Sequence, residues 1–304
     1  MKKSKIILLG IIFSFIGFSY ASELPINNTI QQEDLQLNIF KKNKKSRKSK
    51  KNDTSAAKDS TKSKNDYGKI VGPGTITQEG MFRIHKKKND YYFEIPAKLL
   101  NRDMLIVNKL TKVPAVINKS GINKGINYQT ELVRFEWNKD ENKILVREIQ
   151  PKPQYPEGDA IGKSVDENYI SPLMTSFKIE AYNKDTTAFV IKINDIYNGE
   201  SPINVNSSID KNLSRIVKTK AFEKNVVVIS ELTTHVKEYN QINNLTAEVS
   251  SSIVLLPEKP MTGRYTTPRV GYFYVPQLFF SDKQQKLDSR KLITRWRLEP
   301  KPED

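Results

Sequence analysis

The chain has 304 residues, no cysteine and a formal net charge of +16 at pH 7. This length suffices for one large domain or two ordinary ones, and the lack of cysteine excludes a disulfide framework, a thiolate metal site and a cysteine-linked lipid anchor. The charge is uneven: residues 1–65 carry 14 basic and 5 acidic side chains, or +9, which leaves +7 for residues 66–304. The part of the chain that we expect to fold is therefore only mildly basic.

Residues 1–21 have the pattern of a secretory signal peptide. Three lysines precede an apolar run of 13 residues from Ile6 to Phe18, and small residues at Ser19 and Ala21 occupy the positions that a signal peptidase reads. This run is too short for the roughly 20 residues that span a bilayer, and no later segment approaches that length. We expect cleavage after Ala21 and a soluble mature protein without a transmembrane segment, exported to the periplasm, the outer surface or the medium.

Residues 22–65 are rich in lysine, asparagine and serine, and we expect this segment to be disordered. Between Lys41 and Lys51 there are eight basic residues and no acidic one. A polar, like-charged tract buries too little apolar surface to offset the entropy of ordering it. Modules that bind nucleic acid interleave aromatic residues with basic ones, and none occurs between Lys41 and Tyr67. The composition favours a solvated spacer and argues against a nucleic-acid partner.

From Asp66 onward, apolar residues recur mostly with a period of two, which predicts half-buried strands joined as hairpins. The predicted hairpins pair residues 81–85 with 91–95, 133–137 with 144–149, 177–181 with 189–193 and 226–236 with 245–256, and residues 105–110 add another strand. Helix signals are limited to one turn at 96–100 and a short capped segment at 281–291. We predict a mainly β fold of antiparallel sheets built of hairpins, with a few short helices. Residues 66–304 form either one region or a small module to about residue 110 followed by a larger one.

Motifs for catalysis or metal binding are missing from the sequence. The two histidines, His85 and His235, lie 150 positions apart, so no H-E-x-x-H pair can be written, and strand phase predicts that both face solvent. The segment from Gly158 to Ser164 is like a phosphate-binding loop, but only three residues separate its glycines where that loop needs four.

The acidic pairs at 157 with 159 and at 166 with 167 are expected in solvated loops, and there is no G-x-S-x-G motif. We therefore predict no catalytic, cofactor-binding or metal-binding residue in this chain. Because arginine and the large aromatic residues are favoured at interface centres, the candidate interface residues are Arg269, Tyr272, Arg295, Trp296 and Arg297.

Several segments together resemble the non-catalytic N-terminal half of a family of large secreted bacterial zinc-dependent metallopeptidases of the zincin type. They are Glu79-Gly80-Met81-Phe82 with Tyr91-Tyr92-Phe93-Glu94-Ile95-Pro96 and residues 99–105, Ser176-Phe177-Lys178-Ile179-Glu180-Ala181-Tyr182, residues 254–261, residues 268–273, and Ile293-Thr294-Arg295-Trp296-Arg297-Leu298-Glu299-Pro300. The resemblance covers residues 66–304.

In that family, the last of these segments is followed by a catalytic domain with an H-E-x-x-H zinc helix, whose glutamate polarises the attacking water. The resemblance implies that residues 66–304 are an accessory region serving a zincin catalytic domain, either in the same chain or in a separate one, and that peptide substrates and zinc belong to that domain. It implies a hydrolase only for the full-length assembly, because no family catalytic or metal residue maps onto this chain. The alternative is a stand-alone exported β-rich module whose basic tail binds anionic envelope polymers, in which case binding would weaken steeply with salt.

Overall fold

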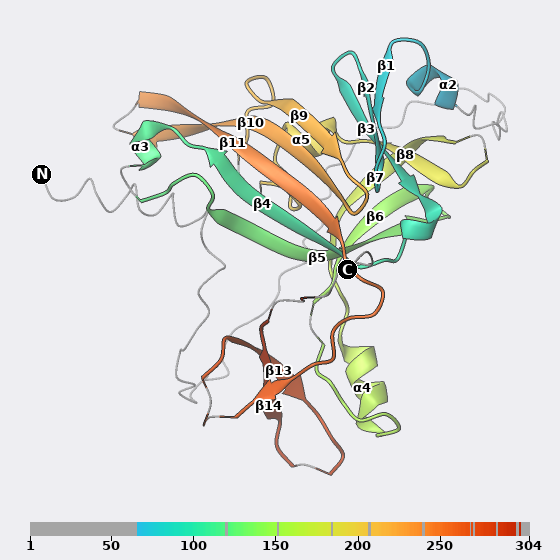
Figure 1. The fold of residues 1–304 in the computed structure, drawn as a ribbon, viewed down its shortest axis with the longest axis vertical. Coiled ribbons are helices and arrows are strands. Elements are labelled where there is room, and N and C mark those ends of the chain that lie inside the picture. The colour runs from blue at the N-terminus through green and yellow to red at the C-terminus, as the bar shows by residue number, and fades with distance from the viewer. Residues whose placement is uncertain are drawn as a thin grey trace, which may run out of the picture. The chain divides into compact units, whose positions relative to one another are not determined.

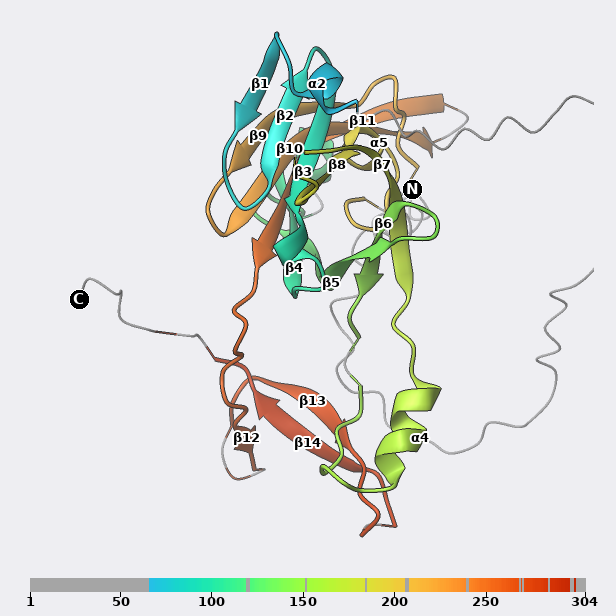
Figure 2. The same cartoon turned by 90° about the vertical axis from the view of Figure 1, so that its right-hand side faces the viewer.

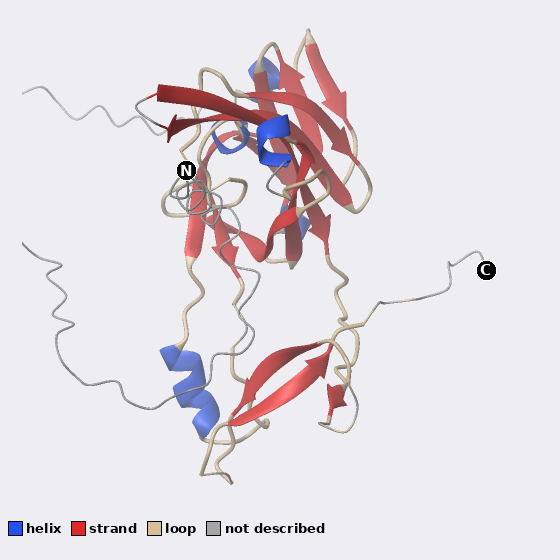
Figure 3. Ribbon diagram, turned by 90° about the vertical axis from the view of Figure 1, so that its left-hand side faces the viewer, coloured by secondary structure: helices blue, strands red, loops and turns tan. Residues whose placement is uncertain are grey.

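The structure is a computed structural model that describes residues 66–118, 121–150, 152–183, 185–205, 208–238, 241–267, 269, 271–283, 285–295 and 298. The predicted signal peptide and disordered basic segment lie outside the described residues. In the described part, strands predominate and the helices are short (Figure 3). The predicted fold class, mainly β with antiparallel sheets and a few short helices, is confirmed.

Eleven of the described strands form one antiparallel sheet in the order β1-β2-β3-β8-β7-β6-β5-β4-β11-β10-β9 (Figure 1). Their bounds are β1 (Thr75–Gln78), β2 (Arg83–Lys87), β3 (Asp90–Pro96), β4 (Met104–Lys112), β5 (Asn127–Asn138), β6 (Lys143–Glu148), β7 (Leu173–Tyr182), β8 (Ala188–Lys192), β9 (Arg215–Ala221), β10 (Asn225–Glu238) and β11 (Gln241–Leu255). Most neighbouring strands are also consecutive in the chain. The exceptions are β3 beside β8 and β4 beside β11, and these two pairings tie the early strands to the later ones.

Three further strands form a separate small sheet in the order β12-β14-β13 (Figure 2). These are β12 (Tyr265–Thr266), β13 (Tyr274–Phe279) and β14 (Asp288–Ile293). The helical elements are α2 (Tyr67–Ile70), a 3-10 turn (Ala97–Leu99), α3 (Ala115–Asn118), α4 (Ile161–Asn168) and α5 (Asn194–Tyr197). No helix within the described ranges is both long enough and apolar enough to cross a membrane.

The large sheet curls, so that the start of β2 meets the end of β9. The Met81 N–H donates to the carbonyl oxygen of Phe222 at 2.7 Å. A Cβ at position 80 would lie only 2.7 Å from the Phe222 nitrogen, so this close approach requires Gly80. Inside the curl, the Phe82 ring packs against Phe93 and Phe135 with centroid distances of 5.6 and 5.7 Å. The core therefore draws on residues far apart in the chain.

The outer face of the sheet is covered locally by α2. Ile70 on this helix packs against Ala181 of β7 and Val190 of β8. Four consecutive residues of β8, from Ala188 to Ile191, are buried in consequence. A strand buried on both faces loses the period-two alternation of apolar and polar residues, as the run Ala188–Ile191 does.

All four predicted hairpins are confirmed, as β2–β3, β5–β6, β7–β8 and β10–β11, and the added strand at 105–110 lies within β4. The predicted helix at 281–291 is wrong, because Asp288–Ile293 forms β14. Strand pairing with β13 there outweighs a weak local capping signal, and the Arg290 guanidinium carbon lies 3.4 Å from the centroid of the Phe279 ring on that neighbouring strand.

The expectation that residues 166 and 167 lie in a solvated loop is also wrong, because both belong to α4. The Asp282 carboxylate accepts hydrogen bonds from the backbone N–H groups of Ala160 and Ile161, at 2.7 and 3.1 Å. These bonds satisfy donors at the start of the helix. Because the capping residue lies more than 120 positions away in the chain, no local pattern predicts this helix.

Candidate functional site

A chain of hydrogen-bonded polar side chains crosses the first three strands. In the β2–β3 hairpin Arg83 lies opposite Glu94, and Thr77 of β1 lies opposite His85. His85 Nδ1 is 2.8 Å from the Thr77 hydroxyl oxygen, and His85 Nε2 is 2.8 Å from a carboxylate oxygen of Glu94. The side chains of His85 and Glu94 are 1% and 2% exposed. This is a buried polar network and not a solvated surface.

Two further donors complete the surroundings of Glu94. The Tyr67 hydroxyl donates to its carboxylate at 3.0 Å, and the Arg83 guanidinium donates at 3.2 Å and also bonds Glu79 at 2.7 Å. Burial raises the pKa of Glu94, but the hydrogen bonds from His85 and Tyr67 and the charges of His85 and Arg83 outweigh it and bring that pKa below its ordinary value. Glu94 is therefore held as a carboxylate at neutral pH.

The prediction that His85 faces solvent is wrong. Strand phase places it on the outer face of the sheet with Arg83, but α2 covers that face, and the Tyr67 hydroxyl at the start of this helix reaches the same carboxylate as His85 does. The corresponding prediction for His235 is confirmed, since this side chain is exposed and bonds Asp210 and Asn244 at 2.8 and 2.7 Å.

Sequence reasoning also missed Glu94 and Arg83 as a pair, although the signal was present. The hairpin turns through only two residues between Lys87 and Asp90, which are opposite each other. Counting back from that turn places Arg83 opposite Glu94. An acidic residue inside the apolar run Tyr91–Ile95 and a basic residue across from it would have indicated a cross-strand ion pair.

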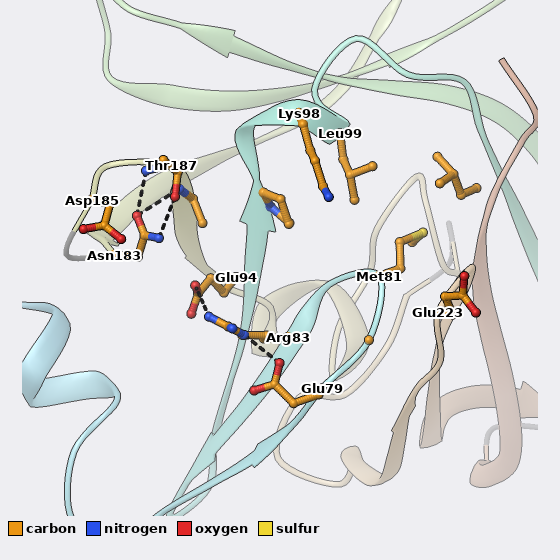
Figure 4. Close-up of a pocket in the computed structure, with 14 residues that line it drawn as sticks. Glu79, Met81, Arg83, Glu94, Lys98, Leu99, Asn183, Asp185, Thr187 and Glu223 are labelled. Carbon is orange, nitrogen blue, oxygen red and sulfur yellow. Dashed lines mark hydrogen bonds and ion pairs between the residues drawn. The ribbon is translucent and has the colours of Figure 1, made fainter.

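A cavity of about 940 Å³ lies beside this network (Figure 4). It is lined by Glu79, Gly80, Met81, Arg83, Glu94, Pro96, Lys98, Leu99, Asn183, Asp185, Thr187, Ala188, Glu223 and Leu255. On one wall, Arg83 lies between Glu79 and Glu94 and bonds both. The Asn183 amide nitrogen bonds the Thr187 hydroxyl, at 2.9 Å. These polar groups bond one another and brace the hairpins.

The two histidines and the carboxylates that the structure describes do not fit a zinc ion. Both ring nitrogens of His85 are engaged, by Thr77 and Glu94, and both ring nitrogens of His235 are engaged, by Asp210 and Asn244. Within the described ranges there is no group of three or more histidine, cysteine, aspartate or glutamate side chains that could hold a metal ion.

The candidate interface residues that the structure describes lie in or next to the small sheet. Arg269 is exposed, Tyr272 is 56% exposed, and Arg295 donates to the carbonyl oxygen of Thr262 at 2.9 Å. Trp296 and Arg297 lie outside the described residues. The structure therefore brings three of the five candidates to one region, and it adds neighbours that sequence reasoning did not single out, chiefly Phe273, which is 89% exposed.

Together these features define a mainly β protein in which a curled antiparallel sheet with a buried acid–base network is accompanied by a small sheet with exposed aromatic residues. The chain belongs to the family described as a domain of unknown function (DUF5117), which matches residues 125–301. Residues 64–113 match a second domain of unknown function (DUF5118). No curated protein and no solved structure matches the chain.

The two matched regions share one sheet in this protein. Strands β3 and β4 belong to the first region, and they pair with β8, β5 and β11 of the second. Each region alone would leave unpaired strand edges. The partition of residues 66–304 into a small and a larger module stays a prediction.

Proposed function

We propose that residues 66–304 are the non-catalytic accessory region of an exported zinc-dependent metallopeptidase. In this proposal the region helps to fold, shield or orient a zincin catalytic domain, present in the same polypeptide or in a separate one, and peptide substrates reach the assembly through that domain. The signal peptide at residues 1–21 directs export to the periplasm, the outer surface or the medium.

One observation carries this proposal: the resemblance of several separate segments, in the same order, to the accessory half of that peptidase family. These segments contribute the residues just before β2, most of β3, the start of β4, most of β7, and the stretches after β11, before β13 and after β14. They therefore include strands whose pairings organise the curled sheet. A resemblance spread over the sheet and the small sheet supports a shared architecture better than a single short motif would.

The experiment removes residues 66–304 in frame from the gene in the producing cell and measures chelator-sensitive peptide hydrolysis in the envelope and the medium. We expect that hydrolysis to fall, since the catalytic domain would lose its folding or orienting partner, and to recover when the intact gene is supplied. The matched control removes only residues 41–51, the basic tract, and should leave hydrolysis unchanged. Unaltered hydrolysis in the first strain would contradict the proposal.

A further inference from the structure

The small sheet of β12, β13 and β14 is hydrogen-bonded to Gln154, and the segment after β13 bonds the start of α4, but the sheet has no buried core in the part of the chain that the structure describes. From Met261 to Arg295, no described residue is buried. A sheet of three strands is stable in water when one of its faces packs against another apolar layer. The small sheet therefore has apolar surface available for a partner.

Both faces of this sheet carry apolar side chains. Pairing places Tyr274 and Leu278 on one face, and Val275 and Phe279 on the other, because successive residues of β13 alternate. Tyr274, Val275 and Leu278 are all exposed, as is Phe273 just before the strand. Phe273 and Val275 share one face with the Arg290 side chain, and Tyr274 and Leu278 share the opposite face with Lys291. Exposed apolar side chains grouped on one face are typical of protein interaction sites.

The free edge of β13 is a poor site for adding a strand. The carbonyl oxygen of Phe273 accepts a hydrogen bond from the Thr294 N–H at 2.8 Å. Because every second residue of a strand bonds the same neighbour, the backbone groups of residues 273, 275 and 277 point toward β14. The backbone groups of Pro276 therefore point away from β14, toward the free edge. Proline has no N–H to donate there. The outward groups of Leu278 and Phe280 already bond Gln154, at 2.8 and 2.7 Å. A partner would therefore bind to a face of this sheet and not to its edge.

The charge of the small sheet and its flanking residues indicates which kind of partner surface it can bind. Residues 261–295 contain seven basic and two acidic side chains, or +5. Two of the cations lie against aromatic rings on opposite faces of the sheet. The Lys291 ammonium is 4.6 Å from the centroid of Tyr274, and Arg290, which also bonds Asp288 at 3.1 Å, lies over Phe279. A second copy of this surface would bring together two sets of positive charge, and residues 22–65, with eleven basic and five acidic side chains, are also positive.

We infer that the small sheet is a docking surface for the acidic, apolar-centred face of another folded domain. Phe273 and Val275, which share one face of the sheet, would fill the centre of the interface, and Arg290 on the same face would meet carboxylates at its rim. The inference rests on the proposed function in one respect: it takes that domain to be the zincin catalytic domain.

The test places a photoreactive phenylalanine analogue at position 273 of the full-length protein in the producing cell, with the same analogue at exposed Ile76 of β1 as the control position. Cross-linked peptides are then sequenced by mass spectrometry. We expect cross-links from position 273, at a yield about tenfold or more above those from position 76, to a polypeptide surface rich in aspartate and glutamate in a domain that carries H-E-x-x-H.

A second variant tests the charge without altering the aromatic centre. Arg290→Glu should lower the cross-linking yield at position 273 about tenfold, because a reversed charge in an interface opposes an acidic partner. Lys218→Glu, an exposed charge reversal on β9, should leave the yield unchanged. Circular dichroism of each purified variant separates loss of binding from loss of folding.

The outcomes separate this inference from the proposed function. Cross-links between two copies of the chain, or none above the control position, would overturn the docking surface, even if a zinc peptidase co-purifies. Cross-links to an acidic surface in a protein without H-E-x-x-H would uphold the docking surface and contradict the proposed function.

Discussion

Glu94 lies in a buried polar network that the apolar residues around it in the sequence do not suggest. It lies in an apolar strand, yet it is buried with hydrogen bonds from His85, Tyr67 and Arg83. A buried carboxylate is tolerated only where donors and positive charge replace its hydration. Its network therefore ties α2 and the first three strands together.

Replacing Glu94 by Gln is expected to lower the free energy of unfolding at pH 7 by about 1.5–3 kcal/mol, the range for hydrogen bonds to a charged group. The control Glu79→Gln removes a more exposed partner of the same arginine and should cost at most about 1 kcal/mol. Urea denaturation of the three proteins measures both values. Equal costs for the two substitutions would contradict the central role of Glu94.

The same carboxylate predicts a pH dependence. Because the pKa of Glu94 is lower in the folded protein than in the unfolded chain, its contribution to stability is present above the unfolded value of about 4.5 and is lost as the pH falls through the folded value. The difference in unfolding free energy between the wild type and Glu94→Gln should therefore shrink as the pH is lowered from 7 to 3.5. A difference that stays constant over this range would contradict the assignment.

Ser230 of β10 is also a buried polar residue, but unlike Glu94 its side chain has no hydrogen-bond partner among the described residues. It is 1% exposed. Ser230→Ala removes a buried hydroxyl without a partner, so it should leave the free energy of unfolding unchanged or raise it by up to about 1 kcal/mol. The control is Thr233→Ser on the same strand, which keeps the hydroxyl that bonds Leu213 and Thr246. A loss of more than about 1 kcal/mol in Ser230→Ala, measured by urea denaturation, would contradict this account.

At the scale of elements, the hairpins were predictable and the elements held by distant residues were not. β5 with β6, for example, is specified by alternation on both strands and by the polar turn 139–142, all within one short segment. By contrast, α4 begins at a cap from Asp282, and β14 depends on its pairing with β13. The sequence indicated Arg269, Tyr272 and Arg295 as interface candidates, but the buried position of His85 depends on α2, which had no helix signal.

The edge of β13 gives a prediction for a whole element. Pro276→Val restores an N–H group on the outward side of the strand, where it can pair with another chain. We expect the mass measured by sedimentation velocity to rise with protein concentration in this variant. Val275→Ile adds apolar surface without an outward N–H and should behave as the wild type. A variant Pro276→Val that stays monomeric at high concentration would show that the proline does not protect this edge.

At the scale of the whole molecule, residues 64–113 and 125–301 match two domains of unknown function that share a single curled sheet. Because β3 pairs with β8, and β4 pairs with both β5 and β11, strands of the first region are hydrogen-bonded to strands of the second. The two regions must therefore fold together. In the proposed assembly, the small sheet, with its exposed aromatic residues and net positive charge, would bind the partner domain.

The most direct test of the accessory-region proposal is the intact mass and zinc content of the native protein. It is isolated from the envelope and the medium of the producing cell with an antibody to residues 177–193. The proposal predicts a species much larger than Ser22–Asp304, either one longer polypeptide or a stable complex, containing an H-E-x-x-H sequence and stoichiometric zinc. A species with the mass of Ser22–Asp304 alone, free of zinc and of any such partner, would contradict it and favour a stand-alone binding module.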